Sequence, residues 1–254
     1  DGIVEEIYGP NELIRSVLID TLVARGTPGA TSALIRVARQ STGVIQTQAL
    51  NALTQVASVD AIPVLVDFML TAPNTESGAA ARQAILAALQ RGQGFGNAAG
   101  LTAALDRKDL SITAKTEVVN LILLSKDDGA VPALASIAEK DKSGLSLVCI
   151  NALGDWPSNA ALQPMVSMAK SMKQDPQRSA WIQSYLKLLA RAGSNASETD
   201  YEALAGVVKS ADEKRALLQT LQDSGIAGGG VVAAKFTEDP DVAELAREIV
   251  GNDE

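Results

Sequence analysis

The chain has 254 residues, of which 46% are hydrophobic and 3% aromatic. Its net charge of −8 argues against nucleic-acid binding, because a protein that binds nucleic acid needs a basic face. The chain contains no histidine, which excludes Ser-His-Asp catalysis and His-ligated metal sites. No apolar run approaches the roughly 18 residues that a membrane-spanning helix needs, so we expect no membrane insertion.

Alanine and leucine supply 41 and 29 of the residues, and both favour helices. Along the chain, Ala- and Leu-rich helices repeatedly end in a leucine or isoleucine followed by a glycine or small polar turn, at spacings of 31 to 36 residues. Within such a helix, apolar residues recur at helical spacing, as at Ala49, Ala52, Leu53 and Val56. This period predicts a repeat of helix, turn and helix. In chain order, the terminal residues, called anchors below, are Leu22, Leu53, Leu89, Ile122, Leu153, Leu189 and Leu221.

The helix that follows each anchor helix also repeats. Residues 61–65 (AIPVL) and 130–134 (AVPAL) are near copies two periods apart, and residues 161–164 (ALQP) continue the series. Proline is well placed in a first helical turn, where its missing N–H has no intrahelical partner. Residues 178–191 carry two neighbouring apolar stripes, so we expect Trp181 and Tyr185 to pack between repeats.

The spacing, with a Pro-x-Leu helix followed by an Ala-Leu helix, resembles HEAT repeats of a divergent bacterial, armadillo-like type. Residues 236–246 (FTEDPDVAELA) are similar to that family's Leu-x-Asp-x-Asp-x-x-Val-Arg-x-x-Ala core, although Ala243 replaces its arginine. Arg82, seven residues before Leu89, matches the family's basic position, and four of the seven such positions are basic. In such repeats this basic side chain reaches a carboxylate or a helix-end carbonyl of the adjacent unit, and we call this the strut hypothesis. The other six positions are Arg15, Gln46, Lys115, Ser146, Ile182 and Lys214.

The resemblance implies an all-α fold, a right-handed α-α superhelix (α-solenoid) of about seven helix-turn-helix repeats. It covers residues 1–254 as a single array, with an acidic C-terminal capping region at residues 198–254. That region carries 13 acidic and 5 basic side chains, and therefore the whole net charge. We interpret it as a solvated end, with an acidic partner-binding surface as the less favoured alternative.

Candidate chemical sites are weak. Cys149 is the only cysteine and has apolar neighbours, so we expect a buried, inert thiol. The loop at residues 92–97 (GQGFGN) and the turn at 228–230 (GGG) lack the context of phosphate-binding motifs, and the acidic pairs and triplets lack calcium-loop spacing. The sequence therefore predicts no catalytic residue, no cofactor and no metal site. The chain begins at Asp1, so any leader lies outside it, and both a cytoplasmic and a periplasmic or secreted location stay open.

By the resemblance, the second helix of each pair lines the concave face where partners dock. We expect a non-catalytic, monomeric scaffold that binds a protein or peptide there. The alternatives are an accessory repeat domain of a larger bacterial, carbohydrate-related enzyme, or a repeat enzyme like the phycobilin lyases. Trp156 has two possible roles, contact with a partner and packing within the core, and we favour packing. The predicted partner-facing residues are Gln48, Gln55, Gln83, Asn120, Trp156, Gln183 and Lys187.

Overall fold

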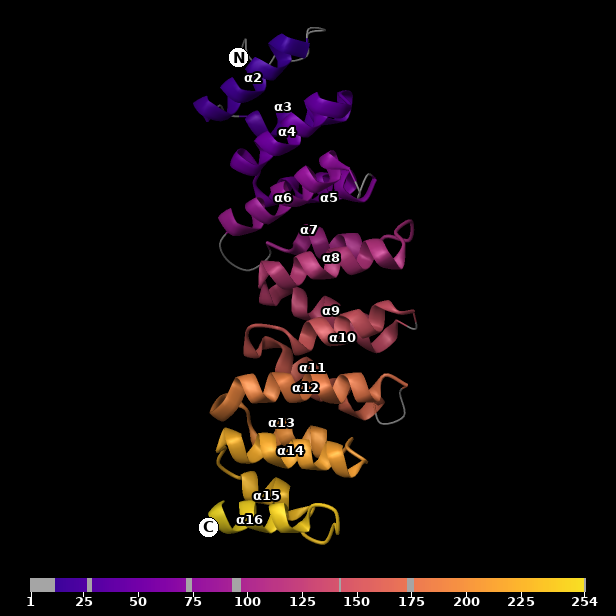
Figure 1. The fold of residues 1–254 in the computed structure, drawn as a ribbon, viewed down its shortest axis with the longest axis vertical. Helices are drawn as coiled ribbons and strands as arrows, with labels where there is room; N and C mark the ends of the chain where they lie inside the picture. The colour runs from indigo at the N-terminus through magenta and orange to yellow at the C-terminus, as the bar shows by residue number, and fades with distance from the viewer. Residues whose placement is uncertain are drawn as a thin grey trace. The chain divides into compact units, whose positions relative to one another are not determined.

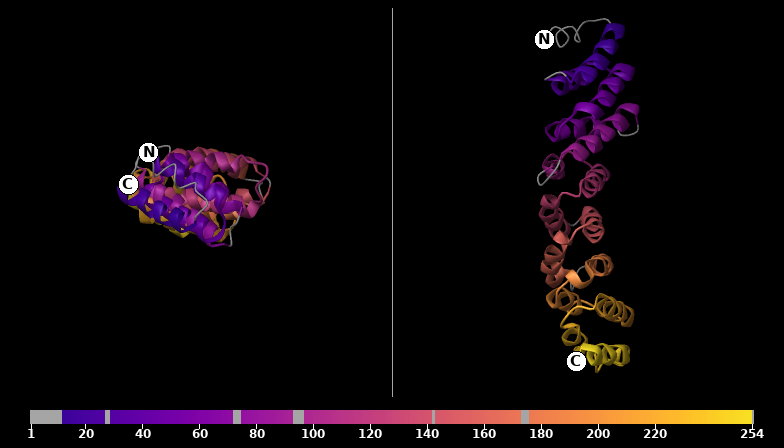
Figure 2. Two further views of the ribbon diagram at one scale, coloured as in Figure 1. Left: turned by 90° about the horizontal axis from the view of Figure 1, so that it is seen from above. Right: turned by 90° about the vertical axis from the view of Figure 1, so that its left-hand side faces the viewer.

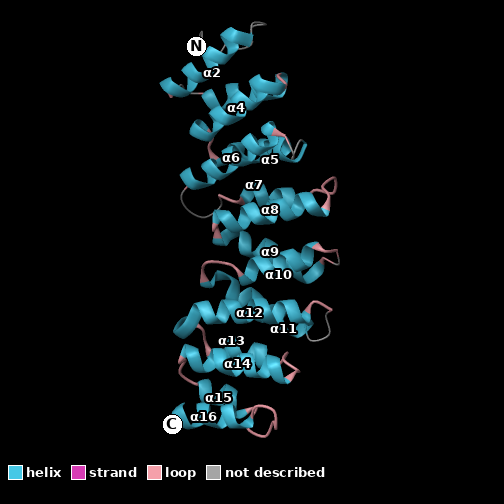
Figure 3. Ribbon diagram, viewed as in Figure 1, coloured by secondary structure: helices cyan, strands magenta, loops and turns pink. Residues whose placement is uncertain are grey.

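The fold is taken from a computed structural model, which describes residues 12–26, 29–71, 75–92, 97–141, 143–172 and 176–253. The chain forms two compact units, unit 1 (Asp1–Gly129) and unit 2 (Ala130–Glu254). The described residues form helices joined by loops and turns, without a strand (Figure 3). The prediction of an all-α fold is therefore confirmed. None of the described helices is both long and apolar enough to cross a bilayer.

Unit 1 alternates longer and shorter helices along the chain (Figure 1). A 3-10 turn, η1 (Val59–Ala61), leads into α5. The α-helices of the unit are α2 (Glu12–Arg25), α3 (Ala30–Gln40), α4 (Gly43–Val56), α5 (Ile62–Thr71), α6 (Glu76–Arg91), α7 (Ala99–Leu105) and α8 (Ile112–Ser125).

Unit 2 is also built of consecutive α-helices and contains the 3-10 turns η3 (Asn159–Ala161) and η4 (Gly193–Asn195). A further turn, η2 (Asp128–Ala130), precedes its first helix. The α-helices of the unit are α9 (Val131–Lys140), α10 (Leu145–Gly154), α11 (Leu162–Met172), α12 (Arg178–Ala192), α13 (Glu198–Ala205), α14 (Ala211–Ser224), α15 (Gly229–Ala234) and α16 (Ala243–Asp253).

Each odd-numbered helix packs against the even-numbered helix that follows it, which gives seven pairs among the described residues. Within each unit, even helices also stack on even helices, and odd helices stack on odd ones in unit 2 and between α5 and α7 in unit 1. The right-hand view of Figure 2 shows the pink to yellow helices of unit 2 nearly end-on, in these two layers. The predicted helix-turn-helix repeat is therefore present in both units. A single array across the unit boundary stays a prediction.

All seven anchors lie on even-numbered helices and are buried. Leu53 and Leu153, for example, have no exposed surface at all. Inside the units, α4 and α12, for example, contact the even helices before and after them as well as their odd partners, so apolar residues are needed on several of their flanks. The core consequently lies between the two layers and between successive pairs.

Local sequence explains where the helices begin and end. Ser197 and Ser210 each form a capping box, in which the serine side chain and the residue three positions later satisfy backbone N–H groups at the start of α13 and α14. Pro132 stands in the first turn of α9, as the repeated motif predicts. Gly225 ends α14 at φ 57°, a left-handed conformation that glycine adopts without a steric penalty.

Candidate interaction surface

The even helices of unit 1 expose one stripe each, and the four stripes have identical spacing. Each consists of positions i, i+4, i+7 and i+11, which lie on one side of a helix. All sixteen residues are exposed or half-buried. Together they form the even-helix face of unit 1: Leu13, Val17, Asp20 and Ala24 on α2; Val44, Gln48, Asn51 and Gln55 on α4; Ala79, Gln83, Leu86 and Gln90 on α6; Thr113, Glu117, Asn120 and Leu124 on α8.

A groove of about 310 Å³ lies between α2 and α4 on this face. Gln48 donates from Nε2 to the Asp20 carboxylate and to the Ser16 carbonyl, each at 3.2 Å, so its side chain is held across the groove. The groove therefore brings together two of the predicted partner-facing residues, Gln48 and Gln55. Its lining residues are Asp20, Val23, Ala24, Gln48, Asn51, Ala52 and Gln55.

An aliphatic rim adjoins the groove at the N-terminal ends of the same two helices. Leu13 and Val44 are each 80% exposed and Val17 is 65% exposed. In the described residues, six of the eight exposed large apolar side chains lie in unit 1. Exposed apolar clusters beside polar grooves mark interaction sites more often than isolated apolar residues do.

The sequence prediction did not include this rim, because apolar residues at helical spacing in an Ala- and Leu-rich chain are typical of a buried helix face. A signal was nevertheless present. Leu13 stands 31 residues before Val44, and Val17 stands 31 residues before Gln48, which is the same offset as that between Leu22 and Leu53.

The charges of the even-helix face of unit 1 are few and are engaged within the unit. Asp20 accepts the hydrogen bond from Gln48, and Glu117 pairs with Arg82 at 2.5 Å. The remaining members of the four stripes are uncharged. A surface of amides and aliphatic groups offers hydrogen bonds and apolar contact without selecting a partner by charge.

The even helices of unit 2 present a different surface. Lys187 lies 3.4 Å from Asp155, and Arg215 lies 3.2 Å from Asp212. A groove of about 370 Å³ between α14 and α16 carries Arg215, Asp241, Glu244 and Glu248 among its lining residues. The even helices of the two units therefore differ in chemistry, with exposed amides mainly in unit 1 and exposed charges mainly in unit 2.

The other five predicted partner-facing residues lie outside the groove between α2 and α4. Gln83 on α6 and Asn120 on α8 are exposed on the face of unit 1, and Gln183 and Lys187 are exposed on α12. Trp156 is fully buried, so the partner-facing assignment of this residue is wrong and the packing alternative holds. Its side chain fills the core directly after α10, where the large apolar ring gains more from burial than from exposure.

The basic side chains that stand seven residues before an anchor differ in the groups that they contact. Arg15 donates to the Ser41 hydroxyl at 3.0 Å, and Lys214 pairs with Asp239 at 2.5 Å. These contacts, like that of Arg82, reach the next helix pair, as the strut hypothesis predicts. Lys115, by contrast, makes no side-chain hydrogen bond or ion pair within the described part of the chain.

Two arginines that the sequence analysis did not single out also join successive pairs. Arg91 and Arg191 each stand two residues after an anchor, near the end of α6 and α12. Arg91 donates from Nε to the Ala57 carbonyl at 3.1 Å, and Arg191 donates to the Gly154 carbonyl at 3.3 Å. Each guanidinium thereby satisfies carbonyl groups at the C-terminal end of the preceding even helix, where no intrahelical donor is available.

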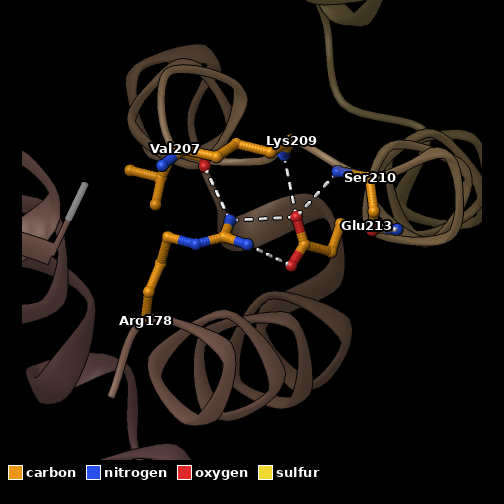
Figure 4. A network of polar contacts seen from close by, with 5 residues as sticks. All are labelled: Arg178, Val207, Lys209, Ser210 and Glu213. Carbon is orange, nitrogen blue, oxygen red and sulfur yellow. Dashed lines mark hydrogen bonds and ion pairs between the residues drawn. The ribbon is translucent and has the colours of Figure 1, made fainter. Parts of the chain in front are cut away.

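A further ion pair links α12 to α14 (Figure 4). Arg178 donates to both carboxylate oxygens of Glu213, at 2.9 and 2.8 Å, and to the Val207 carbonyl at 2.9 Å. The backbone N–H groups of Lys209 and Ser210 donate to the same carboxylate. Burial raises the pKa of Glu213, but these hydrogen bonds outweigh that effect, and the pKa is lowered from its ordinary value.

In the described residues, no group of three or more His, Cys, Asp or Glu side chains could hold a metal ion. Burial, aided by the Asp141 carboxylate, raises the pKa of Cys149 to about 12, so its thiol stays protonated at neutral pH. Asp127 accepts the backbone N–H groups of Ala98 and Gly129, so this carboxylate satisfies backbone donors near the starts of α7 and η2. Most of the loop at residues 92–97 lies outside the described residues.

Similar chains exist among solved structures, whereas the comparisons of sequence give no match. No protein-family model matches the sequence, and no curated protein matches it. A solved structure titled as the complex of CpcE and CpcF of phycocyanin lyase from Nostoc sp. PCC7120 is similar at 15% sequence identity and a TM-score of 0.36. The match covers 99% of this chain and 93% of that chain. The architecture given above rests on the helix pairs of this chain alone.

Proposed function

We propose that this protein is a non-catalytic interaction scaffold that binds a protein or peptide along its even helices. The observation that carries the proposal is the even-helix face of unit 1, with its amide-lined groove of about 310 Å³ and its exposed aliphatic rim. A stacked-pair fold presents such stripes at regular intervals on a rigid support, which is how repeat proteins form extended binding surfaces.

The chemistry of the other side chains supports a scaffold. The Cys149 thiol is buried with a raised pKa, and the carboxylates Asp127 and Glu213 are occupied by backbone N–H groups. Several basic side chains are likewise engaged in contacts between helix pairs, among them Arg82, Arg91, Arg178 and Arg191. These groups therefore make contacts within the fold, which supports a structural role for them in the proposed scaffold.

The test is capture of partners from cells of the source organism by the full chain and by two variants. Asn120→Arg places a bulky charge on the even-helix face of unit 1. Ser32→Arg makes the same kind of change at an exposed position of the odd helix α3. We expect a partner that the wild-type chain and Ser32→Arg retain and that Asn120→Arg loses. Equal retention by all three proteins would contradict docking on this face, and turnover of a captured small molecule would contradict the non-catalytic assignment.

A further inference from the structure

The aliphatic rim and the adjoining groove form one continuous surface at the N-terminal end of unit 1. Leu13 and Val17 are one helical turn apart on α2, and Val44 occupies on α4 the position that Leu13 occupies on α2. Farther along the same stripes, Asp20 and Asn51 line the groove. A ligand that follows the two helices therefore meets aliphatic groups first and amides next.

The electrostatics of this surface restrict its ligand. Asp20 is the only charged member of the α2 and α4 stripes, and it already accepts a hydrogen bond from Gln48 at 3.2 Å. A charged side chain placed on Val17 or Val44 would lose hydration on an aliphatic surface, which is costly, and the two stripes offer a single compensating charge, Asp20, to a basic group only. An aliphatic side chain placed there would instead cover apolar surface that is now in water, which is favourable.

We propose that this surface binds an uncharged segment of another protein that carries Leu, Ile or Val side chains, with the aliphatic groups on Leu13, Val17 and Val44. The inference rests on the proposed function and narrows it to one part of one face and one class of partner. The polar groups of the segment lie over the groove, where Asn51 and Gln55 each offer an amide donor and an amide acceptor. Because no ion pair forms, binding is insensitive to salt.

The experiment uses the full chain and a displayed library of random peptides as the probe. We expect enrichment of uncharged peptides that contain Leu, Ile or Val. Their affinity should change less than about threefold between about 0.1 and about 1 M NaCl, a range over which the screening length falls from about 10 to about 3 Å. Bound peptide should slow amide hydrogen exchange in α2 and α4.

Val44→Glu is the decisive variant, since Val44 is 80% exposed in the first turn of α4, where an acidic residue is compatible with the helix. It should weaken binding of the enriched peptides by about tenfold or more, because an aliphatic contact is lost and a charge is buried. The matched control is Val231→Glu, the same change at a 53% exposed valine of α15 in unit 2, and it should leave binding unchanged.

Three results would overturn the inference while leaving the scaffold proposal intact. These are enrichment of charged peptides whose binding is lost in salt, equal binding by Val44→Glu and the wild-type chain, and a dimer of this chain that Val44→Glu dissociates. In the last case a second copy would be the occupant. If no peptide is enriched and the capture experiment with Asn120→Arg also finds no partner, both proposals fail.

Discussion

Arg178 at the start of α12 and Glu213 in the first turn of α14 are joined by two hydrogen bonds, of 2.9 and 2.8 Å, between successive helix pairs. Each side chain is only 17% exposed, and the carboxylate also completes the capping box of α14. This one contact therefore couples the position of one helix to the beginning of another.

Replacing Arg178 by alanine should destabilise unit 2. The change leaves a half-buried carboxylate without its guanidinium and a Val207 carbonyl without its donor, and charged hydrogen bonds of this kind contribute about 1–3 kcal/mol. Urea unfolding followed by circular dichroism measures the loss. Arg215→Ala is the control, since its partner Asp212 is 95% exposed, and it should stay within about 0.5 kcal/mol of wild type.

The same pair should make stability depend on pH in the acidic range. The folded-state pKa of Glu213 lies below the ordinary value of 4.5, so its stabilisation is fully present above that value and is lost as pH falls through the folded pKa. Glu213→Gln lacks this titration. We therefore expect the difference in unfolding free energy between wild type and Glu213→Gln to be constant near neutral pH and to shrink below pH 4.5. A difference that persists undiminished under acid would contradict the assignment.

Gly154 should not tolerate a side chain. A Cβ at this position would lie 2.5 Å from the Ser184 Cβ and 2.7 Å from its Cα, so α10 and α12 would have to separate. We expect Gly154→Ala to cost about 1–3 kcal/mol despite the better helix propensity of alanine. Gly144→Ala is the matched control, because nothing lies within 4 Å of its Cβ position and its φ is −63°. Similar thermal melts for the two variants would show that the helices can move apart freely.

The basic residues seven positions before the anchors should differ in their contribution to stability. Lys214 and Asp239 pair at 2.5 Å with side chains about one-fifth exposed, whereas Arg82 and Glu117 are each 36% exposed. We expect Lys214→Ala to cost the most, Arg82→Ala to cost up to about 1 kcal/mol, and Lys115→Ala to change stability by less than about 0.5 kcal/mol. Thermal melts give the order, and equal effects at all three positions would contradict it.

Leu153→Asp should be among the most damaging single changes. The anchor has no exposed surface in α10, which packs on both α9 and α12, so the new carboxylate would be buried without a partner. An unpaired buried charge costs several kcal/mol. We expect loss of the cooperative thermal transition of unit 2. Leu147→Asp on the same helix, at a 40% exposed position, should melt close to wild type.

The sequence alone determined the repeat and its register. The period of 31 to 36 residues places every anchor on an even helix, and all seven are buried. Burial of this kind follows a local periodicity, because a helix with apolar residues at i, i+3, i+4 and i+7 has only one way to place them out of water. The buried Cys149 and the packing of Trp181 between helices were predictable for the same reason.

Only the tertiary structure decided what the remaining side chains do. The partners of Arg82, Arg178 and Lys214 lie 25 to 35 residues away, at distances that depend on how one helix pair seats on the next. The same seating buries Trp156, exposes Val44 and separates an amide face from a charged one. The spacing of residues along one helix indicates which of them share a face of that helix. Whether that face is buried depends on the neighbouring helices, whose positions the local sequence does not specify.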